Sequence, residues 1–326
     1  MSQVSTVPII GGGPAGMSCA LWLQNYALQP LIIESESVLG GMAQRDPFPN
    51  EGLLGSPGES GRENAAAFAE HIRQLNIETC LGATPVRLQR IAESNFTLDV
   101  SVPDARTRTF ASSIIVIATG TRFAGEDWLG RVHNAHELAR QGRVHLGAPW
   151  AAEPGNVLGS HIAVIGGGDN AFDVSRMLAE CGVRATIVMR SQRPRAAPLM
   201  VERLRTHVES GHVRVIAGRI VTALADIHGQ LRLFLDDGSE IDADHVLLLF
   251  GYRPNSDGSW LQVELERDAR GYLKVDEKME TSCKGVFAIG DVAEAVHPSI
   301  PTALGSATKA AREIARRLQQ ALPTCS

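Results

Sequence analysis

A glycine-rich turn near the N-terminus has the spacing of a phosphate-binding loop. It comprises Gly11, Gly13, Pro14, Ala15 and Gly16, between an apolar run and a helix-forming segment. In such a turn the first glycine permits the tight bend, the second lets a pyrophosphate approach the backbone, and the third lets the helix pack on the strand. The helix N-terminus then offers free N–H groups and a positive dipole to phosphate. The spacing alone is weak evidence, because glycine turns are common.

Two carboxylates extend this motif. Glu34 ends the next β-branched stretch, about 20 residues on, where an acid accepts hydrogen bonds from ribose hydroxyls. Near the other end of the chain, residues 286–292 read VFAIGDV, a strand followed by Gly290 and Asp291. A carboxylate there can face a flexible polyol chain, which FAD has as ribitol and NAD lacks. We therefore expect the first module to bind FAD.

A second glycine turn repeats the first. It comprises Gly166, Gly168, Asp169, Asn170 and Ala171, with alanine in the close-packing position. Residues 164–189 match residues 9–34 without a gap, and each segment reads as strand, turn, helix and strand. The repeat predicts two βαβ units.

The second module lacks the acid of the first. Met189 stands where Glu34 stands, and Arg190, Arg193 and Arg195 follow. An acid would repel a 2′-phosphate, whereas arginines bind phosphate by charged hydrogen bonds. This favours NADPH over NADH, although a merely solvated basic loop stays an alternative.

The remaining elements complete an α/β fold of two Rossmann-like dinucleotide-binding domains. Each domain is expected to have three layers, two of β-strands and one of helices (ββα). Short strands are expected at residues 84–110, 113–120, 213–241 and 245–251, and two more at 271–291. Residues 122–160, rich in Gly, Pro and Ala, are expected to be a loop that crosses between the domains. Residues 303–322 predict an amphipathic helix whose basic residues form a solvated face, namely Lys309, Arg312, Arg316 and Arg317.

Composition limits the functional classes. The 326 residues are 44% hydrophobic and 21% charged with a net charge of −5, which is typical of a soluble protein of two domains and gives no sign of nucleic-acid binding. No apolar run approaches the ~20 residues of a membrane span, and no signal peptide is recognised, so we expect a cytoplasmic protein. The five cysteines contain no CxxC pair, and Cys19 is expected in the core.

Five motifs in order resemble one known family. GGGPAG, IATG, GGGDNA, FGYRPN and AIGD are similar to low-molecular-weight thioredoxin reductases and their relatives over almost the whole chain. The resemblance implies a discontinuous FAD-binding domain, residues 1–120 and 248–326, with an NAD(P)H-binding domain, residues 121–247, inserted in it. It also implies a homodimer in which NADPH passes hydride to the flavin.

The resemblance carries over further residues. Gly40, Gly41 and Met42 match the family's GGQ loop beside the flavin ring, with Met42 in place of Gln. Arg190 and Arg195 match two arginines of its HRR…R motif. The remaining matches are Ala118, Thr119 and Gly120 in the crossing segment, Gly290 and Asp291 at the ribitol, and Pro301 and Thr302 near the pyrimidine edge.

The departure from the family concerns thiols. Pro149, Trp150, Ala151 and Ala152 occupy the place of the CATC motif, so disulfide reduction by the family route is not expected. The chain in this respect resembles thioredoxin-reductase-like ferredoxin/flavodoxin–NADP reductases. Trp150 is a candidate cover for the flavin ring, and the alternative is that it packs locally in its Ala- and Pro-rich loop.

Two functional hypotheses follow. The first is an FAD-dependent oxidoreductase that passes electrons from NADPH to a redox protein such as ferredoxin or flavodoxin, or to a small acceptor. The flavin performs the chemistry, so no catalytic side chain is required. The alternative is an FAD-binding redox sensor or electron-transfer partner whose second site is vestigial or repurposed.

Overall fold

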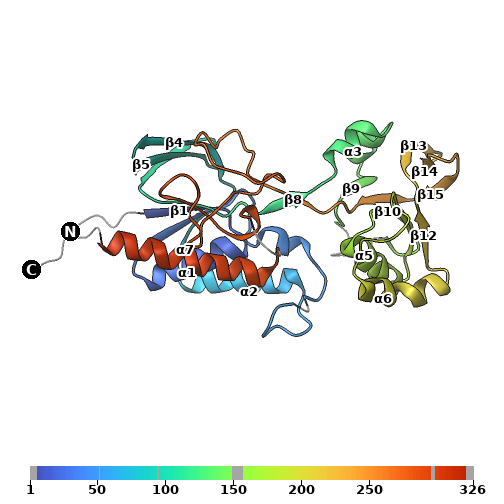
Figure 1. Cartoon of the computed structure of the whole chain (residues 1–326), viewed down its shortest axis with the longest axis horizontal. Helices are drawn as coiled ribbons and strands as arrows, with labels where there is room; N and C mark the ends of the chain where they lie inside the picture. The colour runs from blue at the N-terminus through green and yellow to red at the C-terminus, as the bar shows by residue number, and fades with distance from the viewer. Residues whose placement is uncertain (1–5, 51, 94, 149–156, 295–297, 321–326) are drawn as a thin grey trace, which may run out of the picture. The chain divides into compact units, whose positions relative to one another are not determined.

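The chain forms two compact units in the computed structural model, which describes residues 6–50, 52–93, 95–148, 157–294 and 298–320. One unit comprises Met1–Arg122 and Arg253–Ser326, and the other comprises Phe123–Tyr252 (Figure 1). The chain passes between them through two short strands, β8 (Thr121–Phe123) and β17 (Tyr252–Pro254), which pair with each other.

The first unit is built on a parallel five-stranded sheet with the order β18-β7-β1-β2-β3. Its strands are β1 (Thr6–Ile10), β2 (Gln29–Ile33), β3 (Glu78–Cys80), β7 (Ile115–Ile117) and β18 (Val286–Ala288). Three antiparallel strands form a separate sheet, β4 (Thr84–Ala92), β5 (Asn95–Ser101) and β6 (Thr107–Ser112). The helical segments are α1 (Pro14–Asn25), η1 (Gly41–Arg45), α2 (Gly61–Gln74), η4 (Gly290–Val292) and α7 (Ile300–Gln320).

The alternation of side chains along the parallel strands creates three layers. Ile9 and Ile32 face a core shared with α1, α2 and α7. Their neighbours Ile10 and Ile33 face a second core, where they meet Phe96 and other residues of the antiparallel sheet. Helices therefore cover one face of the parallel sheet and antiparallel strands cover the other (Figure 1).

The C-terminal helix α7 is held by an ion network that sequence reasoning missed. Arg317, expected on a solvated face, is half-buried and forms ion pairs with Glu280 and Glu313. Its guanidinium carbon also lies over the Phe287 ring, 5.3 Å from the ring centroid. The expectation was wrong for Arg317 because its partner Glu280 lies 37 residues away in the sequence.

The second unit repeats the plan. Its parallel sheet has the order β12-β11-β10-β16-β9, and a three-stranded antiparallel sheet, β13-β14-β15, packs on one face. The strands are β9 (Val144–Leu146), β10 (His161–Ile165), β11 (Arg184–Met189), β12 (Val213–Ala217), β13 (Val221–Ile227), β14 (Gln230–Leu235), β15 (Glu240–Ala243) and β16 (His245–Leu248). The helices are α3 (Glu126–Arg131), α4 (Ala135–Arg140), α5 (Asp169–Glu180) and α6 (Pro198–Glu209). The predicted α/β fold with two three-layer units is thereby confirmed.

Two segments differ from expectation. Residues 122–160, expected as a loop, contain α3, α4 and β9, and β9 completes the parallel sheet by pairing with β16. Residues 271–291 form one strand, β18, where two were expected, and otherwise pair through isolated bridges. Within the described residues, no helix is both long enough and apolar enough to cross a membrane.

A pair of histidines at the β9 edge of the second sheet makes stability depend on pH. The rings of His145 and His245 lie 5.6 Å apart, and burial, followed by repulsion from His245, lowers the pKa of His145 from 6.5 to about 4. Burial and then Arg143 lower the pKa of His245. The folded chain therefore favours neutral imidazole. Stability from this shift is present above pH 6.5 and is lost as the pH falls toward 4.

We expect wild-type stability to drop between pH 7.5 and 5.0 by about 1–2 kcal/mol more than that of the His145→Leu variant, after discounting for the partial exposure of the ring. Urea unfolding followed by circular dichroism at both pH values measures the difference. The other titratable groups are shared by the two proteins, so their contributions cancel to first order. Equal pH dependence in the two proteins would contradict the assignment.

Candidate functional site

The first glycine turn follows β1, the central strand of its sheet. Gly11 has φ +113°, and a Cβ there would lie 2.2 Å from the carbonyl oxygen of Ala118. A Cβ on Gly16 would lie 1.9 Å from the carbonyl oxygen of Gly11. At Gly13, by contrast, φ is −72° and the nearest atom to a Cβ is 3.9 Å away. The fold therefore requires glycine at positions 11 and 16, whereas at position 13 the described structure itself leaves room for a side chain.

Glu34 lies beside this turn, as its spacing predicts. Its carboxylate is buried and accepts hydrogen bonds from the backbone N–H of Gly12 at 2.6 Å and of Glu36 at 2.9 Å, and from the Ser35 hydroxyl at 3.0 Å. A carboxylate offers about four acceptor positions, so one remains for a ligand hydroxyl. The structural role of Glu34 in fixing the turn was not foreseen from the sequence.

The Gly40-Gly41 segment packs on the same turn. The Gly40 N–H donates to the carbonyl oxygen of Gly12 at 2.8 Å, and a Cβ on Gly41 would lie 3.1 Å from the Cα of Gly13. Both glycines have positive φ, and Met42 follows in η1. The structure therefore brings this segment to the position where a pyrophosphate would approach Gly13.

One further segment of the first unit, at Gly290, meets the turn. Gly290, with φ +67°, approaches it so closely that a Cβ would lie 2.7 Å from the Cβ of Ala15. Its N–H donates to the Ser306 hydroxyl of α7 at 2.9 Å, and the half-buried Asp291 follows. Pro301 and Thr302 are exposed in the first turn of α7.

The crossing segment continues from β7 past the same turn. The Ala118 N–H donates to the Ile10 carbonyl at 2.8 Å. The Thr119 hydroxyl donates to the carbonyl of Asn255, whose side-chain amide donates back to the Thr119 carbonyl, each at 2.8 Å. Gly120 has φ +61° and its carbonyl accepts the Asn255 N–H. The crossing is thus locked in place within the first unit.

The second glycine turn, after β10, reproduces this geometry. A Cβ on Gly166 would lie 2.5 Å from the Leu249 carbonyl oxygen, and Ala171 is fully buried at the close-packing position. A Cβ on Gly168, where φ is −98°, would meet nothing within 4 Å. Met189 lies against the turn as Glu34 does in the first unit, because a Cβ on Gly167 would be 3.1 Å from its Cβ.

The arginine loop after β11 is bonded to this turn. The backbone N–H groups of Arg195 and Ala196 donate to the Gly167 carbonyl at 2.7 and 3.1 Å, and the Ala197 N–H donates to the Asp169 carboxylate at 2.6 Å. Asp169, the first residue of α5, thus holds the loop at Ala197, directly before α6, a role that the sequence did not suggest.

The side chains of that loop face solvent. Arg190 and Arg195 are exposed, and neither forms an ion pair with another described residue. Ser191, at the place of a third arginine, instead donates its hydroxyl to the Arg193 carbonyl at 2.8 Å. Two exposed arginines therefore lie on a loop whose backbone is bonded to a turn that is open to phosphate.

No described cysteine is placed for redox chemistry with another. Cys19 is fully buried in the first core, and burial raises the pKa of its thiol to about 12, which confirms that it is a core residue. Cys80, Cys181 and Cys283 are free thiols. Trp150 and the other residues at the CATC position lie outside the described part of the chain, and the described part contains no cluster suited to a metal ion.

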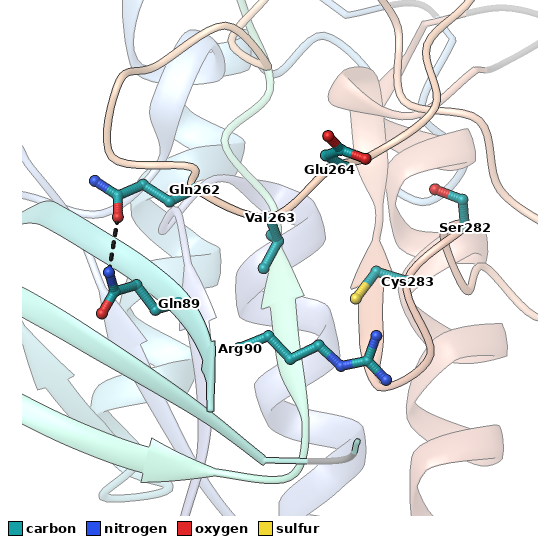
Figure 2. A pocket seen from close by; sticks show the side chains of 7 residues that line it. All are labelled: Gln89, Arg90, Gln262, Val263, Glu264, Ser282 and Cys283. Carbon is teal, nitrogen blue, oxygen red and sulfur yellow. Dashed lines mark hydrogen bonds between the residues drawn. The ribbon is translucent and has the colours of Figure 1, made fainter. Parts of the chain in front are cut away.

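The first unit also holds a cavity of about 560 Å³, whose lining is shown in Figure 2. None of the predicted site residues lines it; its lining consists of Gln89, Arg90, Gln262, Val263, Glu264, Ser282 and Cys283. Gln89 and Gln262 bond to each other at 3.0 Å across its wall.

Two units, each with a glycine turn at the carboxyl edge of a parallel sheet, define a protein built from two dinucleotide-binding folds. The chain belongs to the pyridine nucleotide-disulphide oxidoreductase family, which matches residues 5–313. FAD and NADPH are the cofactors that this family uses, which confirms the cofactor prediction.

Individual relatives span nearly the whole chain. It is 29% identical to a ferredoxin–NADP reductase of Ignicoccus hospitalis, over 88% of this chain and 90% of the relative. It is 25% identical to a thioredoxin reductase of Coxiella burnetii, over 97% of each. The solved thioredoxin reductase of T. acidophilum superposes with a TM-score of 0.80 at 24% identity, covering 95% of this chain and 97% of that one. The resemblance to this group of reductases is thereby confirmed.

Proposed function

We propose that the protein is an NADPH-dependent FAD oxidoreductase that passes electrons to a redox protein or a small acceptor without a CxxC disulfide. The single observation that carries the proposal is the pair of open glycine positions. Gly13 and Gly168 have room for a side chain and ordinary φ angles, yet both are glycine. Close approach of a pyrophosphate at each turn accounts for this.

The first unit is proposed to hold FAD. The residues that would contact it converge on one turn although they come from five separate stretches of the chain. These stretches are Gly11–Gly16, Glu34, Gly40–Met42, Ala118–Gly120 and Gly290–Asp291, with Pro301 and Thr302 following in α7. When bound, the flavin accepts hydride from a nicotinamide and releases electrons singly or in pairs.

The second unit is proposed to hold NADPH. The turn at Gly166–Ala171 would receive the pyrophosphate at the N-terminus of α5. Arg190 and Arg195 would receive the 2′-phosphate, because the loop that carries them is bonded to that turn. The FAD domain, expected at residues 1–120 and 248–326, is thus proposed to be the first unit, Met1–Arg122 and Arg253–Ser326, and the NADPH domain, expected at residues 121–247, to be the second unit, Phe123–Tyr252.

The acceptor is proposed to be a ferredoxin, a flavodoxin or a small molecule, and the active species a homodimer. Support comes from the cysteines, since the sequence has no CxxC pair and Cys19 is buried. The relatives carry both names, ferredoxin–NADP reductase and thioredoxin reductase, so only the chemistry of this chain distinguishes between them.

An anaerobic titration tests the proposal. NADPH is expected to bleach the visible absorbance of the bound flavin at one equivalent per chain, and NADH to do so only at higher concentration. The reduced protein is then mixed with ferredoxin, flavodoxin, ferricyanide and thioredoxin. We expect electrons to reach at least one of the first three.

A separate control tests the proposal that no cysteine takes part in electron transfer. Cys181, the exposed cysteine among the described residues, is replaced by serine, and flavin reduction is expected to be unchanged. Steady NADPH-dependent reduction of thioredoxin by wild type would contradict the assignment. A flavin that neither nucleotide reduces would favour the alternative, a redox sensor with a repurposed second site.

A further inference from the structure

An aromatic pair in the second unit stands next to its glycine turn. The rings of Phe123 and Tyr252 lie 5.3 Å apart at 31°, and Tyr252 is 41% exposed. The Tyr252 hydroxyl accepts a hydrogen bond at 3.1 Å from the side-chain amide of Asn170. Because Asn170 is the second residue of α5, this bond joins the aromatic pair directly to the turn.

The pair is held from both sides by backbone contacts. The Ala124 N–H donates to the Gly251 carbonyl at 2.9 Å, which keeps the two ring-bearing segments together. Phe123 packs so closely on Gly147 that a Cβ there would lie 2.3 Å from the ring. An exposed ring fixed in this way presents a preformed apolar face to solvent, where a ligand can stack without ordering the side chain.

The strand order places this face on a particular side of the turn. β10 is flanked by β11, which leads to Arg190, and by β16, which leads through Leu249 to Tyr252. A dinucleotide crosses the carboxyl edge of such a sheet with its pyrophosphate at the turn. If the adenosine half of the dinucleotide meets the arginines that follow β11, its nicotinamide half must extend toward β16, on the other side of the turn.

We propose that Tyr252, supported by Phe123, forms the stacking face for the nicotinamide ring of NADP(H) in the second unit. The Tyr252 ring contacts the nicotinamide, and its hydroxyl holds Asn170 at the pyrophosphate turn. The cationic ring of NADP⁺ is especially suited to the electron-rich face of a tyrosine. This inference rests on the proposed function. It adds a residue, Tyr252, that recognises the nicotinamide and not the adenosine half of the dinucleotide.

The test uses two ligands that differ only in nicotinamide, NADP⁺ and 2′-phospho-ADP-ribose. Their dissociation constants are measured by calorimetry with the FAD-loaded protein. In Tyr252→Leu we expect the preference for NADP⁺ over 2′-phospho-ADP-ribose to fall about tenfold, because the stacking surface is lost. In Tyr252→Phe the ring remains, so we expect the preference to be kept while both ligands weaken by about threefold through the loss of the Asn170 bond.

Controls separate this inference from the proposed function. Tyr26→Leu, in the first unit, is expected to leave both dissociation constants unchanged, and the FAD content and thermal transition of every variant report folding. If wild type binds neither ligand, the proposed function and this inference both fail. If wild type binds both ligands, but Tyr252→Leu weakens them equally or not at all, the inference alone is overturned.

Discussion

Replacing Gly13 by alanine is expected to yield a folded, colourless protein that no longer retains FAD. The φ of −72° suits alanine, and no atom lies within 3.9 Å of the added Cβ. Alanine is a poorer residue than glycine at a helix N-cap, so we expect a loss of only about 1 kcal/mol of stability. The methyl group would stand where the pyrophosphate approaches, and we expect FAD affinity to fall about 100-fold.

Two glycine variants serve as matched controls for Gly13→Ala. Gly305→Ala, inside α7 and with no atom within 4 Å of its Cβ, is expected to keep FAD and to gain up to about 1 kcal/mol of stability. Gly16→Ala is expected to fold poorly, because its Cβ would meet a carbonyl oxygen at 1.9 Å. Absorbance spectra, FAD release on denaturation and circular dichroism distinguish these results. A Gly13→Ala protein that retains one FAD per chain would contradict the proposal that the FAD pyrophosphate approaches Gly13.

The equivalent substitution in the second unit, Gly168→Ala, tests which unit binds which cofactor. Gly168→Ala meets the same conditions, with φ −98° and no atom within 4 Å of the Cβ. It is expected to remain yellow, yet its flavin should resist bleaching by NADPH. If Gly168→Ala instead released FAD, the order of the two modules would be reversed.

The parts of the fold that depend on local pattern were predictable from sequence. The ungapped repeat gave both βαβ units, and it placed Met189 against the second turn as Glu34 lies against the first. The glycines at positions 11 and 166 could be recognised for the same reason, since each bends beside the carbonyl of the residue that follows a neighbouring strand. Spacing and residue type carry this information within about 30 residues.

The parts that depend on distant partners were not predictable. β9 was read as loop because Val144–Leu146 is short and gains its structure by pairing with Val246–Leu248. Asp169 carries no sequence signal for binding the Ala197 N–H, 28 residues away. The approach of Gly290 to Ala15 joins the two ends of the chain, and only the folded sheet order brings them together.

Removing Arg190 and Arg195 together is expected to abolish the preference for NADPH while leaving NADH binding almost unchanged. Both guanidinium groups are exposed, and their loop is bonded to the glycine turn through Gly167 and Asp169. Each charge-assisted contact to a 2′-phosphate contributes about 1.5–3 kcal/mol before solvent screening, so two contacts give a preference of at least about tenfold. NADH has no 2′-phosphate and gains nothing from either arginine.

The matched control is Arg184→Ala, which removes an exposed charge from the opposite end of β11. Any general effect of net charge on a phosphorylated ligand should appear there as well. Dissociation constants for NADPH and NADH at two salt concentrations measure the outcome, and the NADPH preference of wild type should shrink with salt because the arginines are exposed. Equal affinity of wild type for the two nucleotides would mean that the loop is only a solvated basic segment. Equal weakening of both in the double variant would show that the arginines support the turn and do not read the 2′-phosphate.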